Sequence, residues 1–307
     1  MRIVFPSTPD KYAFPLRAIG ACGRYDTISD CEFLDERRII CCDRQMARLY
    51  LLEVDYDTKT YTILDSVDAV VNGKPVHTEL ICLQKDILYT ISYTDKLFSC
   101  RIVGNKFTDM KGVIVSSEEA YHGVCDGGAD GMVYVTNMLQ NTITLYNTRS
   151  RRMKKMVCEG GVRMKDAALL DKSHILVLSS DRGPIITTQH TDGHISPVNT
   201  PYNSHALIYN RHTGVLCDTH VFKDMQVDGC FFYKNKCWVT CTDEKGQGSL
   251  WRATITGNKF SDGIHLPCEG FPHGIAIKDN ILAYTSYGEC SLVLHRIDDD
   301  GNIVDAI

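Results

Sequence analysis

The stretch Pro272-His-Gly-Ile-Ala-Ile-Lys-Asp-Asn-Ile-Leu-Ala-Tyr-Thr-Ser286 decides the fold of this chain. Two short apolar runs flank a Lys-Asp-Asn turn, and a third run, Ser291-Leu-Val-Leu-His-Arg296, follows a few residues later. Apolar runs of this length, separated by Asn, Asp and Gly, predict strands linked as hairpins. A fourth run, Asn302-Ile-Val-Asp-Ala306, completes a unit of four antiparallel strands.

The same unit recurs six times along the 307 residues. Each copy opens on a residue that can bind a metal or move a proton, and these openings are Asp30, Glu79, His122, Asp166, Asp228 and His273. They fall 49, 43, 44, 62 and 45 residues apart, which is the period of four-stranded propeller blades. The sequence therefore predicts an all-β fold, a six-bladed β-propeller of four-stranded antiparallel blades, with residues 1–307 forming a single domain.

Two segments depart from the repeat. The 62-residue interval predicts an insertion in blade 4 at about 183–203, rich in Pro, Thr, Asn and Gly and displayed on one face. Together with His205, the insertion's His190 and His194 could form a recognition loop or an accessory metal site. The residues before Asp30 could supply a strand that joins the last blade to the first, although the sequence does not show which blade they join.

The composition of the chain limits the classes of partner that it is expected to bind. The net charge of −5 predicts no general attraction for nucleic acid or for anionic membranes. The one basic run, Arg149-Ser-Arg-Arg-Met-Lys-Lys155, is interpreted as a solvated blade edge that its charge keeps from pairing. The first residues do not resemble a signal peptide, and no apolar run is long enough to span a membrane. The oligomeric state leaves no signal in the sequence.

Fourteen cysteines are present, and none forms a Cys-X-X-Cys pair. Most lie inside apolar runs, where a thiol behaves as a small buried hydrophobic group. Unpaired thiols suit a reducing compartment, so we expect a cytoplasmic protein; disulfides between neighbouring strands are the alternative.

The openings carry the functional prediction. The first strand of each blade lines the central channel, so residues at its start should gather at one channel mouth. His122 and His273 open blades three apart and should face each other across the axis. We expect His122, His273, Glu79 and Asp228 to ligate a divalent metal ion. Imidazole beside carboxylate favours zinc, iron, manganese or nickel over calcium. Further candidates at the channel mouth are Asp30, Glu32 and His77. The alternative is that these side chains only line a wet channel.

The repeat resembles the six-bladed group that contains regucalcin, gluconolactonase and diisopropylfluorophosphatase, which hold a divalent cation at this position. Val227-Asp228-Gly229 is similar to the group's Pro-Asp-Gly element, and the resemblance implies that Asp228 is a ligand and catalytic group. Pro272-His273-Gly274 is similar to its Pro-Asn-Gly element, with His in place of Asn. Blade 1 lacks the group's Glu-Gly-Pro motif, and blade 4 has Lys165-Asp166 where Asn is typical.

These features favour a metal-dependent hydrolase that acts on a small lactone, ester or phosphoester. The metal would activate water, and Asp228 or Asp166 would take the proton as the catalytic base. Two alternatives stay open. The same site could support a metal-dependent lyase or isomerase, or the propeller could be a non-catalytic protein that binds a small molecule or a protein partner.

Overall fold

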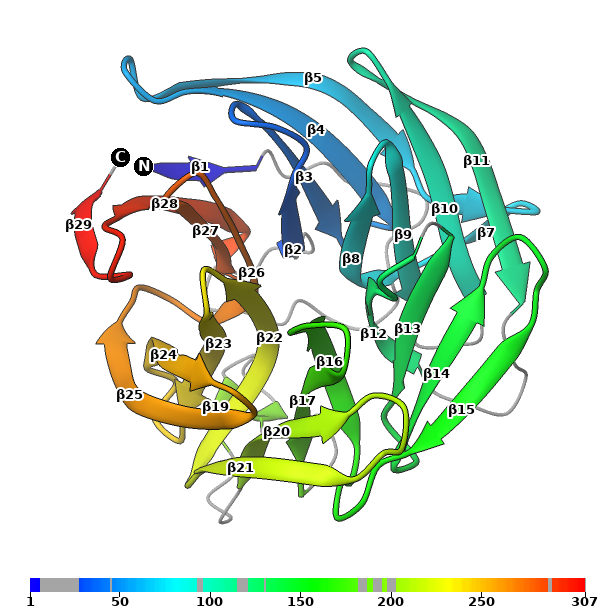
Figure 1. Cartoon of the computed structure of the whole chain (residues 1–307). Coiled ribbons are helices and arrows are strands. Elements are labelled where there is room, and N and C mark those ends of the chain that lie inside the picture. The colour runs from blue at the N-terminus through cyan, green and yellow to red at the C-terminus, as the bar shows by residue number, and fades with distance from the viewer. Residues whose placement is uncertain are drawn as a thin grey trace.

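The computed structural model contains six antiparallel sheets arranged as blades around a central axis (Figure 1). It describes residues 1–5, 28–44, 46–92, 96–114, 121–129, 131–181, 187–189, 195–197, 203–286 and 289–306. The described residues contain strands and turns, with no α-helix. The predicted fold class, an all-β six-bladed propeller, is confirmed.

The blades follow the sequence repeat, each running from the innermost strand outward. Blade 1 consists of β2 (Ile28–Phe33), β3 (Arg38–Asp43), β4 (Arg48–Asp55) and β5 (Thr60–Asp68). Blade 2 consists of β8 (Thr78–Gln84), β9 (Ile87–Ser92), β10 (Lys96–Val103) and β11 (Lys106–Ile114), and a small β6 (Val70–Val71) and β7 (Lys74–Pro75) hairpin precedes it. Blade 3 consists of β12 (Tyr121–Asp126), β13 (Met132–Asn137), β14 (Thr142–Asn147) and β15 (Met153–Val157).

The second half repeats this order. Blade 4 consists of β16 (Met164–Leu169), β17 (His174–Ser180), β20 (Ser204–Asn210) and β21 (Leu216–Phe222). Blade 5 consists of β22 (Met225–Tyr233), β23 (Lys236–Asp243), β24 (Gly248–Thr256) and β25 (Lys259–Pro267). Blade 6 consists of β26 (Pro272–Lys278), β27 (Ile281–Ser286) and β28 (Ser291–Ile297), with β1 (Arg2–Val4) and β29 (Ile303–Ala306) on its outer edge.

Blade 6 is completed from both ends of the chain. Strand β1 pairs with β28 from Arg2 opposite Val293, and β29 pairs with the same strand from His295 opposite Ala306. The N-terminal strand thus joins the last blade, and the chain then crosses to blade 1. This arrangement closes the ring without leaving the sixth sheet short of an outer strand.

Six buried apolar clusters fill the spaces between neighbouring blades. One of them joins Phe33 of blade 1 to Leu292 of blade 6 and includes Ile3 of β1 and the following Phe5. Another joins Leu176 of blade 4 to residues of blade 5 around Trp251. Because alternate residues of each strand point to opposite faces of the blade, every blade contributes to two clusters.

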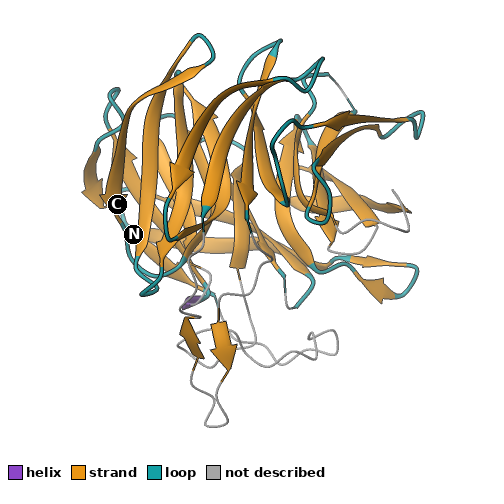
Figure 2. Cartoon of the chain, turned by 90° about the horizontal axis from the view of Figure 1, so that it is seen from below, coloured by secondary structure: helices purple, strands orange, loops and turns teal. Residues whose placement is uncertain are grey.

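Blade 4 carries the predicted insertion between β17 and β20. Within it, β18 (Thr187–Gln189) and β19 (Ile195–Pro197) form a two-stranded hairpin that lies away from the disc of blades (Figure 2). The predicted loop residues His190 and His194 lie outside the described residues. Among the described residues no helix is long and apolar enough to cross a membrane. No disulfide joins any two of the described cysteines.

Candidate axial acid–base site

A β-bulge sets the direction of the opening residues. In all six inner strands the pairing with the second strand shifts register at the opening, between residue pairs such as Tyr121/Val124 and Pro272/Ile275. The same shift occurs in the other four blades. A bulge inserts an extra residue and re-aims its side chain, and bulges are frequent beside active sites. All six openings are buried, from His122 at 1% exposure to Asp30 and Asp166 at 6%.

The bulges of blades 3, 5 and 6 are built in one way. In blade 3 the amide of Gly123 donates to the hydroxyl of Thr136 over 2.8 Å, and that hydroxyl donates to the carbonyl of Lys165 in the next blade over 2.7 Å. A Cβ on Gly123 would come within 2.5 Å of the same carbonyl. The equivalent residues in the other two blades are Gly229 with Thr240 and Gly274 with Thr285. The glycine that follows the opening is therefore a requirement of close approach between blades.

Two of the predicted site residues hold the neighbouring blade. One carboxylate oxygen of Asp30 accepts the amide of Ile81 over 2.8 Å, and one of Asp166 accepts the amide of Cys230 over 2.8 Å. Burial raises the pKa of Asp166 to about 7, and the bond from Cys230 acts in the opposite direction. Sequence reasoning did not foresee this engagement with the backbone.

The side chains of Glu79, His122 and His273 converge, and we call them the axial triad. The Nε2 atoms of His122 and His273 lie 3.6 Å and 3.3 Å from the same oxygen, Oε1 of Glu79. The two imidazole rings are 6.4 Å apart between centroids. The expected approach of the two histidines across the axis is therefore present in the structure.

Backbone carbonyls fix the tautomers of both histidines. Nδ1 of His122 lies 2.9 Å from the carbonyl of Lys165, and Nδ1 of His273 lies 2.8 Å from the carbonyl of Ser29. Because a carbonyl oxygen only accepts, each Nδ1 carries a hydrogen. In a neutral imidazole the Nε2 atom is then an acceptor, and it points to the axis.

The two histidines differ in their pKa. Burial lowers the pKa of His122 to about 4, against the raising effect of Glu79, so this imidazole is neutral. Burial acts in the same direction on His273, but the hydrogen bond to Glu79 and the charge of Asp228 outweigh it and raise its pKa. Groups with opposed pKa shifts in one site are suited to act as base and acid.

Two cations neutralise the acidic side chains. Arg44, from the turn after β3, places its Nε 2.8 Å from Oε2 of Glu79. Burial alone would raise the pKa of Glu79, but Arg44 and the two histidines lower it to about 2. Lys165, with no exposed surface, places Nζ 2.7 Å from Oδ1 of Asp228. Burial likewise raises the pKa of Asp228, and Lys165 reverses that effect and lowers it.

Sequence reasoning missed Arg44, Lys165 and also Gln226, whose Nε2 donates to Asp228 over 2.6 Å. Lys165 stands immediately before the opening of blade 4, so its place in the bulge was the signal that could have revealed it. Arg44 lies in a hairpin turn and has no such signal. The predicted candidate His77 holds this turn, because its Nδ1 lies 2.9 Å from the Arg44 carbonyl.

The residues present do not fit a divalent metal well. Among the residues that the structure describes, no group of three or more His, Cys, Asp and Glu side chains is arranged to hold a metal ion. Both predicted acidic ligands, Glu79 and Asp228, are paired with a cation. A divalent ion at the triad would therefore meet the positive charges of Arg44 and Lys165 close by. The metal stays a prediction.

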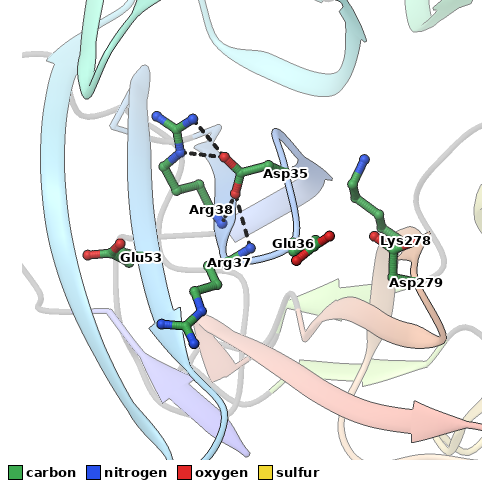
Figure 3. A pocket seen from close by; sticks show the side chains of 7 residues that line it. All are labelled: Asp35, Glu36, Arg37, Arg38, Glu53, Lys278 and Asp279. Atoms are coloured by element: carbon green, nitrogen blue, oxygen red, sulfur yellow. Dashed lines mark hydrogen bonds and ion pairs between the residues drawn. The ribbon is translucent and has the colours of Figure 1, made fainter.

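The remaining candidate, Glu32, lies two residues beyond Asp30 along the same inner strand. Burial raises its pKa to about 8, and Lys278 acts in the opposite direction. At this far end of the inner strands a cavity of about 560 Å³ is lined by Asp35, Glu36, Arg37, Arg38, Glu53, Lys278 and Asp279 (Figure 3). Asp35 and Arg38 are paired with each other there. The cavity therefore lies at the opposite end from the axial triad.

Comparisons with known proteins support the fold alone. No model of a protein family matches the chain, and no curated protein matches it. A structure titled hydrazine synthase, from Kuenenia stuttgartiensis, is similar at 12% identity and a TM-score of 0.59, over 88% of this chain and 76% of that one. A chain of the mitotic checkpoint complex is similar at 12% identity and a TM-score of 0.53, over 86% and 72% of the two chains. The C-terminal WD40 domain of Sif2 matches at 10% identity and a TM-score of 0.50, over 89% and 96%. At these identities the likeness is one of propeller architecture, and it does not assign the chain to the group that its motifs resemble.

Proposed function

We propose that the axial triad is the acid–base centre of a hydrolase that acts on a small lactone, ester or phosphoester. The observation that carries the proposal is the pair of imidazoles on either side of one Glu79 oxygen, with their pKa values shifted in opposite directions. Such a pair can take a proton on one side of a substrate and deliver one on the other.

The chain's own groups suffice for the chemistry. His122, neutral with its lone pair on Nε2, takes a proton from water as the water oxygen bonds to the carbonyl carbon or phosphorus. The charge that develops on the carbonyl or phosphoryl oxygen is stabilised by the ammonium of Lys165. His273, protonated and hydrogen-bonded to Glu79, donates its proton to the leaving oxygen as that bond breaks. The proton that His122 gained then returns to His273 through solvent.

The energetic cost of the cluster supports a functional role. Lys165, Asp228, Glu79 and both histidines are nearly inaccessible, and the axial cluster holds two ion pairs. Replacing buried ion pairs by apolar side chains is often neutral or stabilising, so a plug for the channel would not need them. Groups with strongly perturbed pKa values gather at functional sites.

The test is hydrolysis of a panel of lactones, aryl esters and phosphoesters by the wild-type protein and by His122→Gln and His273→Gln. We expect each variant to lower kcat/KM by roughly 10²- to 10⁴-fold. The matched control is His174→Gln, which replaces a histidine paired with Asp171 in the turn between β16 and β17. Equal activity in all four proteins would remove the proposal. Elemental analysis of protein purified without an affinity tag tests the metal prediction separately.

One observation favours a second candidate function. Asp30, Asp166, Glu79 and Asp228 each have a partner within the chain, so the cluster can also be read as a set of ties between blades. In that case the protein is a non-catalytic propeller that binds a partner at its surface. The similar chain of the mitotic checkpoint complex is part of an assembly. Absence of turnover in the wild-type protein over the whole panel would favour this candidate.

A further inference from the structure

The outer edge of blade 3 carries a concentration of positive charge. Strand β15 and the turn before it hold five basic residues and no acidic one between positions 149 and 155: Arg149, Arg151, Arg152, Lys154 and Lys155. All five are exposed. The chain has a net charge of −5, so this run is a local reversal of its overall sign.

Two other outer strands, β5 and β21, use charge differently. Asp65 on β5 accepts the amide of Phe107 over 2.9 Å and pairs with Lys106. Asp218 on β21 accepts the amide of Phe260 over 2.8 Å. In both cases an acidic residue ties an outer strand to the next blade. Strand β15 has no acidic residue that could do this.

Three of the five cations of the run have no acidic partner within the described part of the chain. Among the residues that the structure describes, Arg151, Arg152 and Lys154 form no ion pair. Like charges this close repel one another, and only an external anion removes that cost. Fewer charges are needed to protect a strand edge, since a single Lys is enough to discourage pairing with another strand.

Strand β15 also exposes apolar side chains and backbone groups. Met153 and Val157 are 46% and 62% exposed, and they share one side of the strand with Lys155. Among the described strands, β15 is the last of its sheet and pairs with β14 alone, so its outer row of amides and carbonyls has no described strand partner, although the Val157 carbonyl lies against the turn at Gly214. An edge of this kind is a template for a further strand.

We propose that β15 is the docking edge for an extended, acidic segment of a partner protein, which adds to blade 3 as a fifth strand. Its carboxylates lie against Arg151, Arg152 and Lys154, and its apolar side chains contact Met153 and Val157. The exposed apolar side chains and the free strand edge favour a polypeptide over a nucleic acid or a membrane. The proposal is independent of the hydrolase activity.

The probe is a fluorescein-labelled octapeptide of alternating Glu and Val, with a Lys–Val octapeptide for comparison, measured by anisotropy at low salt. The test variant is Arg151→Glu/Arg152→Glu/Lys154→Glu. The control Lys111→Glu/Lys223→Glu/Lys259→Glu changes the net charge by the same amount on exposed positions of other blades. We expect the test variant to bind the Glu–Val peptide about 10- to 100-fold more weakly and the control to bind it like the wild type.

Amide hydrogen exchange of residues 153–157 reports strand addition directly. We expect slower exchange in the wild-type protein when the Glu–Val peptide is bound. Equal loss of binding in both variants would show a net-charge effect and overturn the proposal, as would binding without slower exchange. Binding of poly-U RNA or phosphatidylserine vesicles that is lost in the test variant, in place of peptide binding, would overturn it in favour of those partners. Equal thermal unfolding midpoints in the three proteins confirm that the variants are folded.

Discussion

Blades 1–3 and blades 4–6 share two kinds of contact at the axis. Asp30 holds the amide of Ile81 as Asp166 holds that of Cys230, both over 2.8 Å. His122 reaches the carbonyl of Lys165 as His273 reaches that of Ser29. The repeated strings Gly104-Asn-Lys-Phe and Gly257-Asn-Lys-Phe stand in the matching blades 2 and 5.

The halves differ in how they supply positive charge. Ser29 precedes the opening of blade 1, and its hydroxyl donates to the carbonyl of Thr78. Lys165 stands at the same place in blade 4 and pairs with Asp228. In the first half the equivalent acid, Glu79, receives its cation from Arg44 in a turn. The shared contacts link neighbouring blades and orient both histidines, whereas the source of the cation that pairs with the buried acid differs between the halves.

The largest difference in stability between the halves is expected when the residue before the opening, Lys165 in blade 4 and Ser29 in blade 1, is replaced. Lys165→Met leaves Asp228 buried without its cation, and we expect it to lower the free energy of unfolding by about 3–5 kcal/mol. Ser29→Ala removes only a neutral hydrogen bond and should cost about 1 kcal/mol. Urea unfolding measures both. Adding Asp228→Leu to Lys165→Met should restore much of the loss, and a double variant as unstable as the single one would contradict the pairing argument.

A smaller loss of stability is expected at the glycines that make equivalent contacts in the two halves. Gly123→Ala and Gly274→Ala place a methyl group against the neighbouring blade, at Lys165 and at Asp30 respectively. We expect both to lower the free energy of unfolding by similar amounts, about 1–3 kcal/mol each. Gly104→Ala is the control for strain alone, because its left-handed backbone meets no atom within 4 Å of an added Cβ. Because Gly123 and Gly274 do not have a left-handed backbone, a loss in these variants reports the blade contact, and stabilities equal to the wild type would show that the contact is not limiting.

The pH dependence of stability sharpens the comparison for the acids. The pKa of Asp166 is about 7 in the folded protein and near 3.8 when unfolded, so the folded state keeps a proton that the unfolded state loses as the pH rises. This group's contribution to stability is therefore present at low pH and lost between about pH 4 and pH 7. The Asp166→Asn variant does not have this titrating group. The difference between its free energy of unfolding and that of the wild type should therefore increase with pH, by at most about 1.4 kcal/mol per pH unit.

The same measurement with Asp30→Asn extends the comparison to the first half. Burial raises the pKa of Asp30 as well, so the direction should match. For Glu79 we expect a pH dependence of stability with the opposite sign. Its folded pKa is lowered to about 2, and its contribution is lost as the pH falls from about 4.5 towards 2. Urea unfolding series at several pH values give all three slopes, and a flat difference for Asp166→Asn would contradict the assignment.

The smallest expected effect concerns the hydrogen bonds that link outer strands of neighbouring blades. Asp65→Asn and Asp218→Asn weaken equivalent hydrogen bonds to the amides of Phe107 and Phe260. Each should lower the free energy of unfolding by about 1 kcal/mol, and by similar amounts, because the two contacts have the same geometry. A difference of several kcal/mol between the two variants would show that the halves are not equivalent at their periphery.

The sequence was sufficient for the architecture because period and alternation are local signals. It also placed His122 and His273 opposite each other, since three of six blades separate them. It did not predict that Asp30 and Asp166 bind backbone amides while Lys165 faces Asp228. That outcome depends on which residue of a bulge points to the axis, and a shift of one residue reverses it. Arg44 was missed because a side chain from a turn reaches the site only through tertiary packing.

The shared edge of β28 has a consequence for the order of folding. Residues 2–4 pair with residues 291–293, so β1 is synthesised long before its partner strand β28. Blades 1–5 consist of contiguous strands and can assemble as the chain leaves the ribosome, whereas blade 6 and its apolar cluster around Ile3 and Phe5 cannot. Contacts of such long sequence separation form slowly, because the loop must close before the contact contributes. Ring closure is therefore a late event in the biogenesis of this propeller, and until then the inner faces of blades 1 and 6 are exposed to chaperones and proteases.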